Sequence, residues 1–468
     1  PGARTAEAGS EFSSYRGRLN RVEAGAANKN VSASVSGSSE YTDGFQQNSA
    51  FVKNGATGVF SFSAPFSGRL TLRGMEDVSR IGLLSGIPAR VIADWNGDKE
   101  RQANRLDDYQ KTERSLVNAS YEVEPATGTR LSVSAGVGTN VVNAWQFNSM
   151  TRITVQARSV SAKVRLSDTV LGADYERGVL SSDVYGRHTR RTWALYGQQV
   201  LRPATGLEVT PAARYDENFR VDIHDNDRRD HVVSPGLGVV YTPSFAWKFS
   251  ARAAKAWQAP TFADLYDPFV PAADVPANLR PERSVNYQAG GQWNSAAGIY
   301  AIVTGYRSNI RDRIVLDPVR SFAAYNMEKA FNHGVETELG YKSGKCRVSG
   351  SYTHNQSWGR VTAGGWDSLP FSPVHRVSLV ADADTGPVRV FGRARSVSEQ
   401  YTGRGHTGLR VPDFITADLS LSKKIGAIEL SGGADNILDR HYAETADTTN
   451  GYYPQPGRVW RVSAKASF

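Results

Sequence analysis

The chain is built from segments of about ten residues in which apolar and polar side chains alternate strictly. In LVNASYEV the apolar positions are Val117, Ala119, Tyr121 and Val123. The turn EPATGT follows, and RLSVSAGV then repeats the alternation. RVSLVADA, FITADLSLS, AIELSGGAD and the final RVWRVSAKASF carry it as well. A period of two residues places the two kinds of side chain on opposite faces of an extended chain. The pattern therefore predicts antiparallel β-hairpins.

The polar face of these predicted strands carries many charges. It includes a set of basic residues: Arg376, Arg389, Arg393, Arg395, Arg461 and Lys465. Enclosing such charges in the interior of a soluble β-sandwich would cost several kcal/mol each. The segments also have the length of a membrane-crossing strand, about 9–11 residues. We therefore predict an all-β transmembrane barrel whose apolar face contacts lipid and whose polar face lines a lumen. The basic lining would attract anionic ligands or an acidic partner, or else pair with acidic residues of neighbouring strands.

Composition is consistent with this fold and argues against other classes. The apolar fraction is 40%, yet the mean hydropathy is −0.42 and no run of about 18 apolar residues occurs. The net charge of +9 is dispersed, which argues against nucleic-acid binding. PGARTAEAGS has no signal-peptide pattern, so we expect a cytosolic or already processed chain. No composition change marks a boundary, and we expect a single domain over residues 1–468.

The connections between strands differ in length, which orients the predicted barrel. Short turns such as DTGP alternate with long polar segments, and long loops are expected on the cell exterior. Two of these loops hold weak calcium candidates, for which solvated acidic loops are the alternative: Asp94, Asn96, Asp98, Asp222, Asp225 and Asp227. We expect no other cofactor. Neither a G-x-S-x-G motif nor a histidine in a triad context occurs, and we predict that the chain is not an enzyme.

Five longer stretches resemble TonB-dependent outer-membrane receptors. They are AKAWQAPTFADLYDP (254–268), NLRPERSVNYQAGGQW (278–293), YNMEKAFNHGVETELGY (325–341), ADNILDRHY (434–442) and the closing PQPGRVWRVSAKASF. SSYRGRLN and TDGFQQNSAFVKN are similar to the first barrel strands of vitamin B12 and siderophore receptors. The resemblance implies a 22-stranded antiparallel barrel in the bacterial outer membrane, in contact with its lipid and lipopolysaccharide.

The same resemblance implies an N-terminal plug domain with a TonB box, which we do not find in the sequence. Three alternatives are open: the plug is a separate chain, it has been removed, or the barrel has none. In this family, barrel glutamates that face the lumen pair with plug arginines. By resemblance Glu336 keeps such a plug-facing place, whereas Gln288 stands there without a charge.

The final strand resembles the signal that the barrel-assembly machinery reads during insertion. Its apolar positions are Trp460, Val462, Ala464, Ala466 and Phe468. The resemblance as a whole implies uptake of a scarce, large ligand, such as a metal–siderophore or a cobalamin-like compound. A plug supplied in trans would gate the pore, and TonB would act only through that plug. The alternative is a plug-less scaffold or conduit whose lumen is filled by another protein of an envelope complex.

Overall fold

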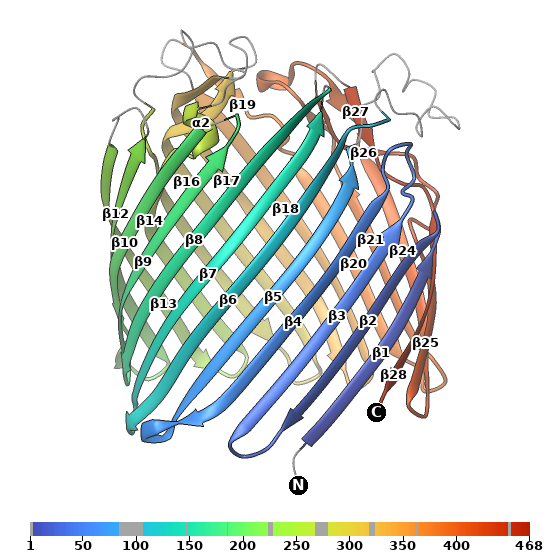
Figure 1. Ribbon diagram of the computed structural model, residues 1–468, viewed down its shortest axis with the longest axis horizontal. Helices are drawn as coiled ribbons and strands as arrows, with labels where there is room; N and C mark the ends of the chain where they lie inside the picture. Colours follow the sequence, from blue (N-terminus) through green and yellow to red (C-terminus); the bar gives the residue numbers. More distant parts are fainter. Residues whose placement is uncertain are drawn as a thin grey trace.

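A computed structural model describes residues 3–83, 106–146, 148–184, 186–222, 228–266, 279–317, 323–360, 364–447 and 451–468. Within these ranges one antiparallel sheet of 24 strands closes on itself, and 22 of them form the wall of the barrel (Figure 1). The other two, β11 (Leu201–Ala204) and β19 (Trp366–Ser368), are short additions to neighbouring wall strands. The predicted 22-stranded barrel is therefore confirmed.

The wall strands follow one another in chain order. They are β1 (Ala3–Ser13), β2 (Gly17–Ala27), β3 (Val31–Thr42), β4 (Phe51–Ala64), β5 (Gly68–Gly82), β6 (Tyr109–Ala126), β7 (Thr129–Gln146), β8 (Ser149–Leu166), β9 (Thr169–Ser182), β10 (Gly186–Gln199), β12 (Leu207–Asp222), β13 (Arg228–Ser244), β14 (Trp247–Gln258), β15 (Glu282–Asn294), β16 (Ile299–Asp317), β17 (Ala323–Ser343), β18 (Cys346–Arg360), β20 (His375–Asp384), β21 (Arg389–Val397), β24 (Phe414–Ile425), β25 (Ile428–Asp435) and β28 (Val459–Ser467).

The last strand closes the barrel. β28 pairs with β25 on one edge and with β1 on the other. Beyond its end, the Phe468 amide donates to the Ala6 carbonyl at 2.8 Å, and the Ala6 amide donates to the Phe468 carbonyl at 3.2 Å. Trp460 and Val462 are each 58% exposed on the outer face. Closure leaves no unpaired edge among the wall strands that the structure describes, which lipid requires because it offers no hydrogen-bonding partner. An assembly-signal role for this strand stays a prediction.

The two-residue alternation separates lipid-facing from lumen-facing side chains. On β7, Val133 is 48% exposed, and Leu131 and Val137 lie on the same outer face. Ser134, between them, lies opposite Ser120 and Ser161, and the Ser161 hydroxyl bonds to a lumenal carboxylate, Asp174, at 2.6 Å. The predicted arrangement, apolar outside and polar inside, therefore holds along this part of the wall.

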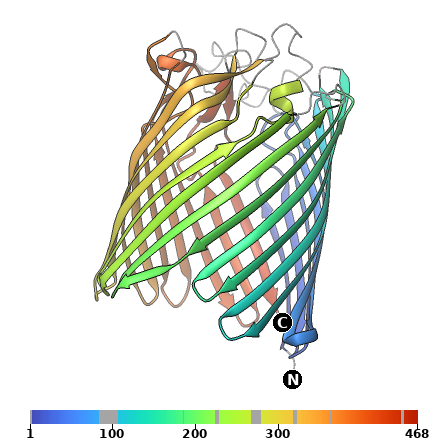
Figure 2. The same ribbon diagram turned by 90° about the vertical axis from the view of Figure 1, so that its left-hand side faces the viewer.

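Short turns gather at one end of the barrel and long connections at the other, as Figures 1 and 2 show. Both chain ends lie at the short-turn end. The long-connection end carries the small elements α2 (Phe262–Tyr266) and η3 (Arg404–His406), and the hairpins β22 (Gln400–Tyr401)–β23 (Arg410–Val411) and β26 (Ala443–Asp447)–β27 (Gly451–Pro454). The 3-10 turn η1 (Pro65–Ser67) belongs to the short-turn end. No helix among the described residues is both long enough and apolar enough to cross a membrane.

Within the described ranges, fully buried apolar side chains are few and lie mainly at the long-connection end. One cluster joins the two small hairpins and contains Val411, Ala443, Ala446 and Tyr452. The Tyr452 hydroxyl also donates to the Arg410 carbonyl at 2.7 Å. A second cluster consists of Met327, Ala330 and Leu369. These clusters pack connections against the barrel, whereas the wall itself is held mainly by its backbone ladders.

We predict that Val133→Arg destabilises the barrel by about 2–4 kcal/mol, because a guanidinium would face hydrocarbon. Ser134→Arg is the matched control on the adjacent residue, where the new charge would face the lumen and cost little. The free energy of unfolding, measured by urea titration in lipid vesicles, distinguishes the two. Equal losses for both variants would contradict the assigned faces.

Candidate functional site

The lumen wall holds the charged residues that the alternation pattern placed on the polar face, and most of the basic ones are ion-paired. Arg389 makes a two-pronged contact with Asp382, with Nε–Oδ1 at 2.7 Å and Nη2–Oδ2 at 2.5 Å. Arg393 Nε donates to Asp418 Oδ2 at 2.8 Å. The other oxygen of Asp418 accepts the Asn436 amide at 2.9 Å. Both carboxylates come from the strand next to that of their arginine, so the register of neighbouring strands brings the charges together.

The remaining pairs tie strands to each other and to the rim. Lys465 Nζ lies 2.7 Å from Glu7 Oε2 across the closing β1–β28 seam. Arg461 pairs with Asp435 on β25. The sequence left two interpretations of the basic lining open, and the geometry shows that five of its six members have a carboxylate partner. A ligand-attracting role stays a prediction.

Arg395 links the wall to an external hairpin. Its Nη2 lies 2.6 Å from Glu444 Oε1 on β26 and donates to the Tyr442 hydroxyl oxygen at 2.9 Å. Its Nε donates to Thr416 Oγ1 at 3.0 Å, and the guanidinium lies 5.3 Å from the centre of the Phe414 ring. Tyr442 lies in the connection between β25 and β26, where burial raises the pKa of its hydroxyl. The contact set fixes the hairpin over the lumen wall.

Arg376 and Glu336 form a different kind of site. Both line one hollow of about 410 Å³, on a register row that runs from Glu336 through Thr353 to Arg376. Among the described residues neither side chain has an ion-pair partner. Two opposite charges on β17 and β20, with β18 between them, can bind a polar group of either sign that enters the lumen.

Gln288, the neutral residue predicted to face a plug, also lies on the lumen side. It stands directly between Arg252 of β14 and Tyr306 of β16. Arg252 was not among the predicted lining residues, although the alternation in WKFSARAAKAW places it on the polar face. Among the described residues Arg252 has no ion-pair partner. The neutral Gln288 therefore faces an arginine of the barrel itself, and Arg252 is left free to bind an occupant of the lumen.

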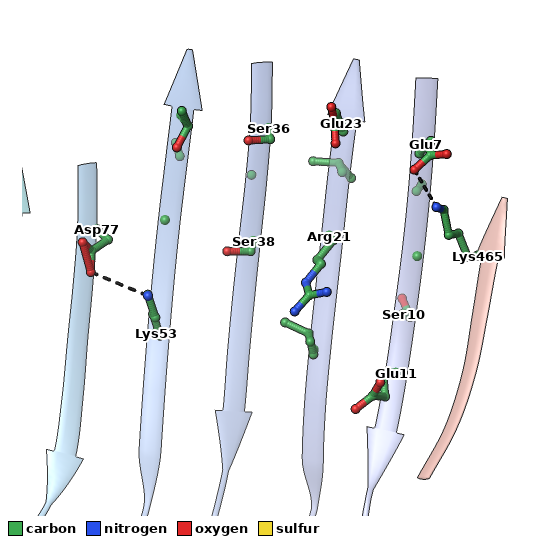
Figure 3. Close-up of a pocket in the computed structure, with 18 of the residues that line it drawn as sticks. Glu7, Ser10, Glu11, Arg21, Glu23, Ser36, Ser38, Lys53, Asp77 and Lys465 are labelled. Atoms are coloured by element: carbon green, nitrogen blue, oxygen red, sulfur yellow. Dashed lines mark ion pairs between the residues drawn. The ribbon is translucent and has the colours of Figure 1, made fainter. Parts of the chain in front are cut away.

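A second hollow, of about 590 Å³, lies along the first strands (Figure 3). It contains the Glu7–Lys465 pair and a longer one, with Lys53 Nζ 3.9 Å from Asp77 Oδ1. Four further charged residues line it without an ion-pair partner in the described part of the chain: Glu11, Arg21, Glu23 and Glu76. This wall has an excess of acidic side chains, which favours a basic surface opposite it.

The calcium candidates are largely outside the described residues. This applies to Asp94, Asn96, Asp98, Asp225 and Asp227. Asp222 ends β12, where its backbone lies opposite His188 of β10. Within the described ranges no group of three or more His, Cys, Asp or Glu side chains could hold a metal ion. Calcium binding stays a prediction.

A close contact between Tyr306 and Gly334 shapes the hollow that contains Glu336. The Tyr306 hydroxyl donates to Asn355 Oδ1 at 2.8 Å. A Cβ at residue 334 would lie 2.5 Å from the Tyr306 hydroxyl and 2.2 Å from the His354 carbonyl oxygen. Only glycine therefore lets the ring cross its strand at this point.

We predict that Gly334→Ala costs about 1–3 kcal/mol, because the added methyl group displaces the ring and the backbone. Gly305→Ala is the control, because its nearest neighbour, the Ala289 carbonyl oxygen, lies 4.0 Å away. Urea titration measures the free energy of unfolding of both variants. An equal loss for Gly334→Ala and Gly305→Ala would contradict the requirement for glycine at residue 334.

Comparison with known proteins supports the same family as the motifs. The family model described as "TonB dependent receptor-like, beta-barrel" matches residues 12–437. A vitamin B12 transporter of Vibrio vulnificus is 26% identical over 242 residues, which cover 50% of this chain and 37% of that protein. A probable TonB-dependent siderophore receptor of Acinetobacter baumannii is 22% identical over 318 residues, covering 56% and 42%. The matches thus span less than half of each of these two relatives.

Solved structures show the same fold. A ferric-catecholate import receptor of Escherichia coli superposes with a TM-score of 0.83 at 13% identity, covering 100% of this chain and 82% of that one. An iron transporter of Neisseria meningitidis gives 0.80 at 16% identity, covering 99% and 81%. Motifs, closed barrel and family match agree: the chain belongs to the TonB-dependent receptor β-barrel family of the bacterial outer membrane.

Proposed function

We propose that the chain forms the barrel of an outer-membrane uptake receptor for a ligand too large for porins, a metal–siderophore or a cobalamin-like compound. Support comes from the family match and from relatives named for vitamin B12 transport and as a siderophore receptor. The wide closed barrel with a polar lumen suits passage of such a ligand. The lumenal charges bind and position, and no side chain is assigned a catalytic task.

The lumen of this receptor is filled by a folded plug that is distinct from the barrel wall. A 22-stranded barrel is too wide for its own side chains to fill and is normally plugged. The observation that carries the proposal is a group of wall charges that have no ion-pair partner in the described part of the chain, among them Arg252, Glu336 and Arg376, with Glu11, Arg21 and Glu23 on the first strands. Lumenal charges that have no ion-pair partner in the wall are groups that a folded occupant can bind. Hydrogen bonds to charged groups are stronger than those between neutral groups.

Energy reaches this receptor through the occupant. TonB contacts the plug from the short-turn end, which is the periplasmic end in this family, and the barrel wall responds only through its contacts with the plug. Glu336 and Arg376 are the two wall groups that we assign to hold the plug in register, because both line one hollow without an ion-pair partner in the described part of the chain.

The proposed function is tested by deleting the gene in its native organism and then complementing the deletion. Uptake of radiolabelled ferric siderophores and of cobalamin is measured with and without an uncoupler. We expect one ligand class to lose energy-dependent uptake and to regain it on complementation. Unchanged uptake of every ligand would refute the receptor role. Copurification of a different envelope protein in the lumen would then favour the scaffold alternative.

We predict that Glu336→Gln lowers the amount of native occupant that copurifies with the barrel by about fivefold, because a charge-assisted hydrogen bond is lost. Glu338→Gln is the matched control: the Tyr300 hydroxyl donates to Glu338 at 2.6 Å, and an amide oxygen still accepts that bond. Quantitative mass spectrometry of barrels purified from native membranes gives the ratio. Equal retention in both variants would remove Glu336 from the contact.

A further inference from the structure

Three arginines form a row on the outer face of the barrel. Arg158 of β8 lies directly opposite Arg177 of β9, which in turn lies directly opposite Arg191 of β10. All three side chains are exposed. They share the face of Tyr175 and Trp193, which are two residues away on the same strands and exposed to the membrane. The row therefore points away from the lumen.

No group in the described part of the chain neutralises this row. Among the described residues none of the three guanidiniums has an ion pair or a hydrogen bond. The Asp174 carboxylate of β9 points to the lumen, where it binds Arg214 at 2.9 Å. Outside, Glu217 of β12 already pairs with Arg229. Like charges directly opposite each other in a ladder are destabilising, so three in succession favour an anion from elsewhere.

The row lies at a sharp boundary on the outer face. The residues directly on its short-turn side are Val160, Tyr175 and Trp193, which form one register row. Beyond them, outward positions are apolar: Ala162, Ala173, Leu195, Val164 and Leu171. On the side of the long-connection end, the outward positions are mostly polar: Gln156, Thr189, Thr154, Ser181 and Arg187. Val179 is the exception. Aromatic rows mark the membrane interface of such barrels, so the arginines lie at the level of the outer-leaflet head groups.

We propose that Arg158, Arg177 and Arg191 form a binding site for the phosphate groups of an anionic glycolipid in the outer leaflet. A guanidinium presents a planar fork that matches phosphate oxygens, and it is desolvated at lower cost than an ammonium. Three forks side by side above an aromatic row fit a head group that carries more than one phosphate on an acylated sugar. The acyl chains of that lipid lie against Val160, Tyr175 and Trp193.

The site is tested by titrating the purified chain in detergent with bisphosphorylated lipid A and counting bound lipid by native mass spectrometry. We expect binding by the wild type, and a loss of at least about tenfold in affinity for the triple variant Arg158→Gln, Arg177→Gln, Arg191→Gln. The control is Arg73→Gln, Lys163→Gln, Arg165→Gln, which removes the same charge from the lumen side and should bind as the wild type does. The single variant Arg177→Gln, in the centre of the row, covers the case in which the triple variant does not fold.

Two further ligands identify what is bound. Lipid A stripped of its phosphates should bind the wild type and the triple variant equally weakly, and inorganic phosphate should compete only at far higher concentration. Binding by the outward triple variant that equals that of the lumenal control would overturn the proposal. Inorganic phosphate that binds as tightly as lipid A would also overturn it, because the site would then hold a free ion and not a lipid.

Discussion

Backbone hydrogen bonding in a medium without water is the constraint on which this structure depends. Lipid offers no partner to an unpaired amide or carbonyl, so every strand of the wall must be bonded on both edges. The chain meets this demand by pairing β28 with both β25 and β1, and the paired backbone continues to Phe468. The scarcity of buried apolar side chains in the wall follows from it, because the ladders themselves hold the barrel together.

Closure and alternation together separate two environments within one layer of residues. The outer face changes from apolar to aromatic and then to basic and polar along β8, β9 and β10. The inner face collects charges of both signs, and many of them are paired with residues of adjacent strands. Glu336 and Arg376 have no such partner among the described residues, and they are therefore available to bind a molecule in the lumen.

The fold, the closure and the faces of individual side chains could be predicted because each depends on local sequence with a period of two residues. The assignment of Arg393 and Leu419 to opposite faces needed only their positions in an alternating segment. Which carboxylate each arginine would meet could not be predicted, because it depends on register: Arg393 meets Asp418 because β21 and β24 align at that point. Arg252 lies on the predicted polar face, but its nearness to Gln288 follows only from the alignment of β14 with β15. The row of Arg158, Arg177 and Arg191 needs three strands in register, and single-strand patterns do not contain that information.

The external hairpin β26–β27 is fastened to the wall through Arg395. This guanidinium reaches Glu444 of the hairpin while also holding Thr416 inside the barrel. Lifting the hairpin would strip the arginine of its counter-ion and expose a bare positive charge at the mouth of the channel. The rim and the interior are thus coupled electrostatically, so that opening at the cell surface would change the electric field inside the pore.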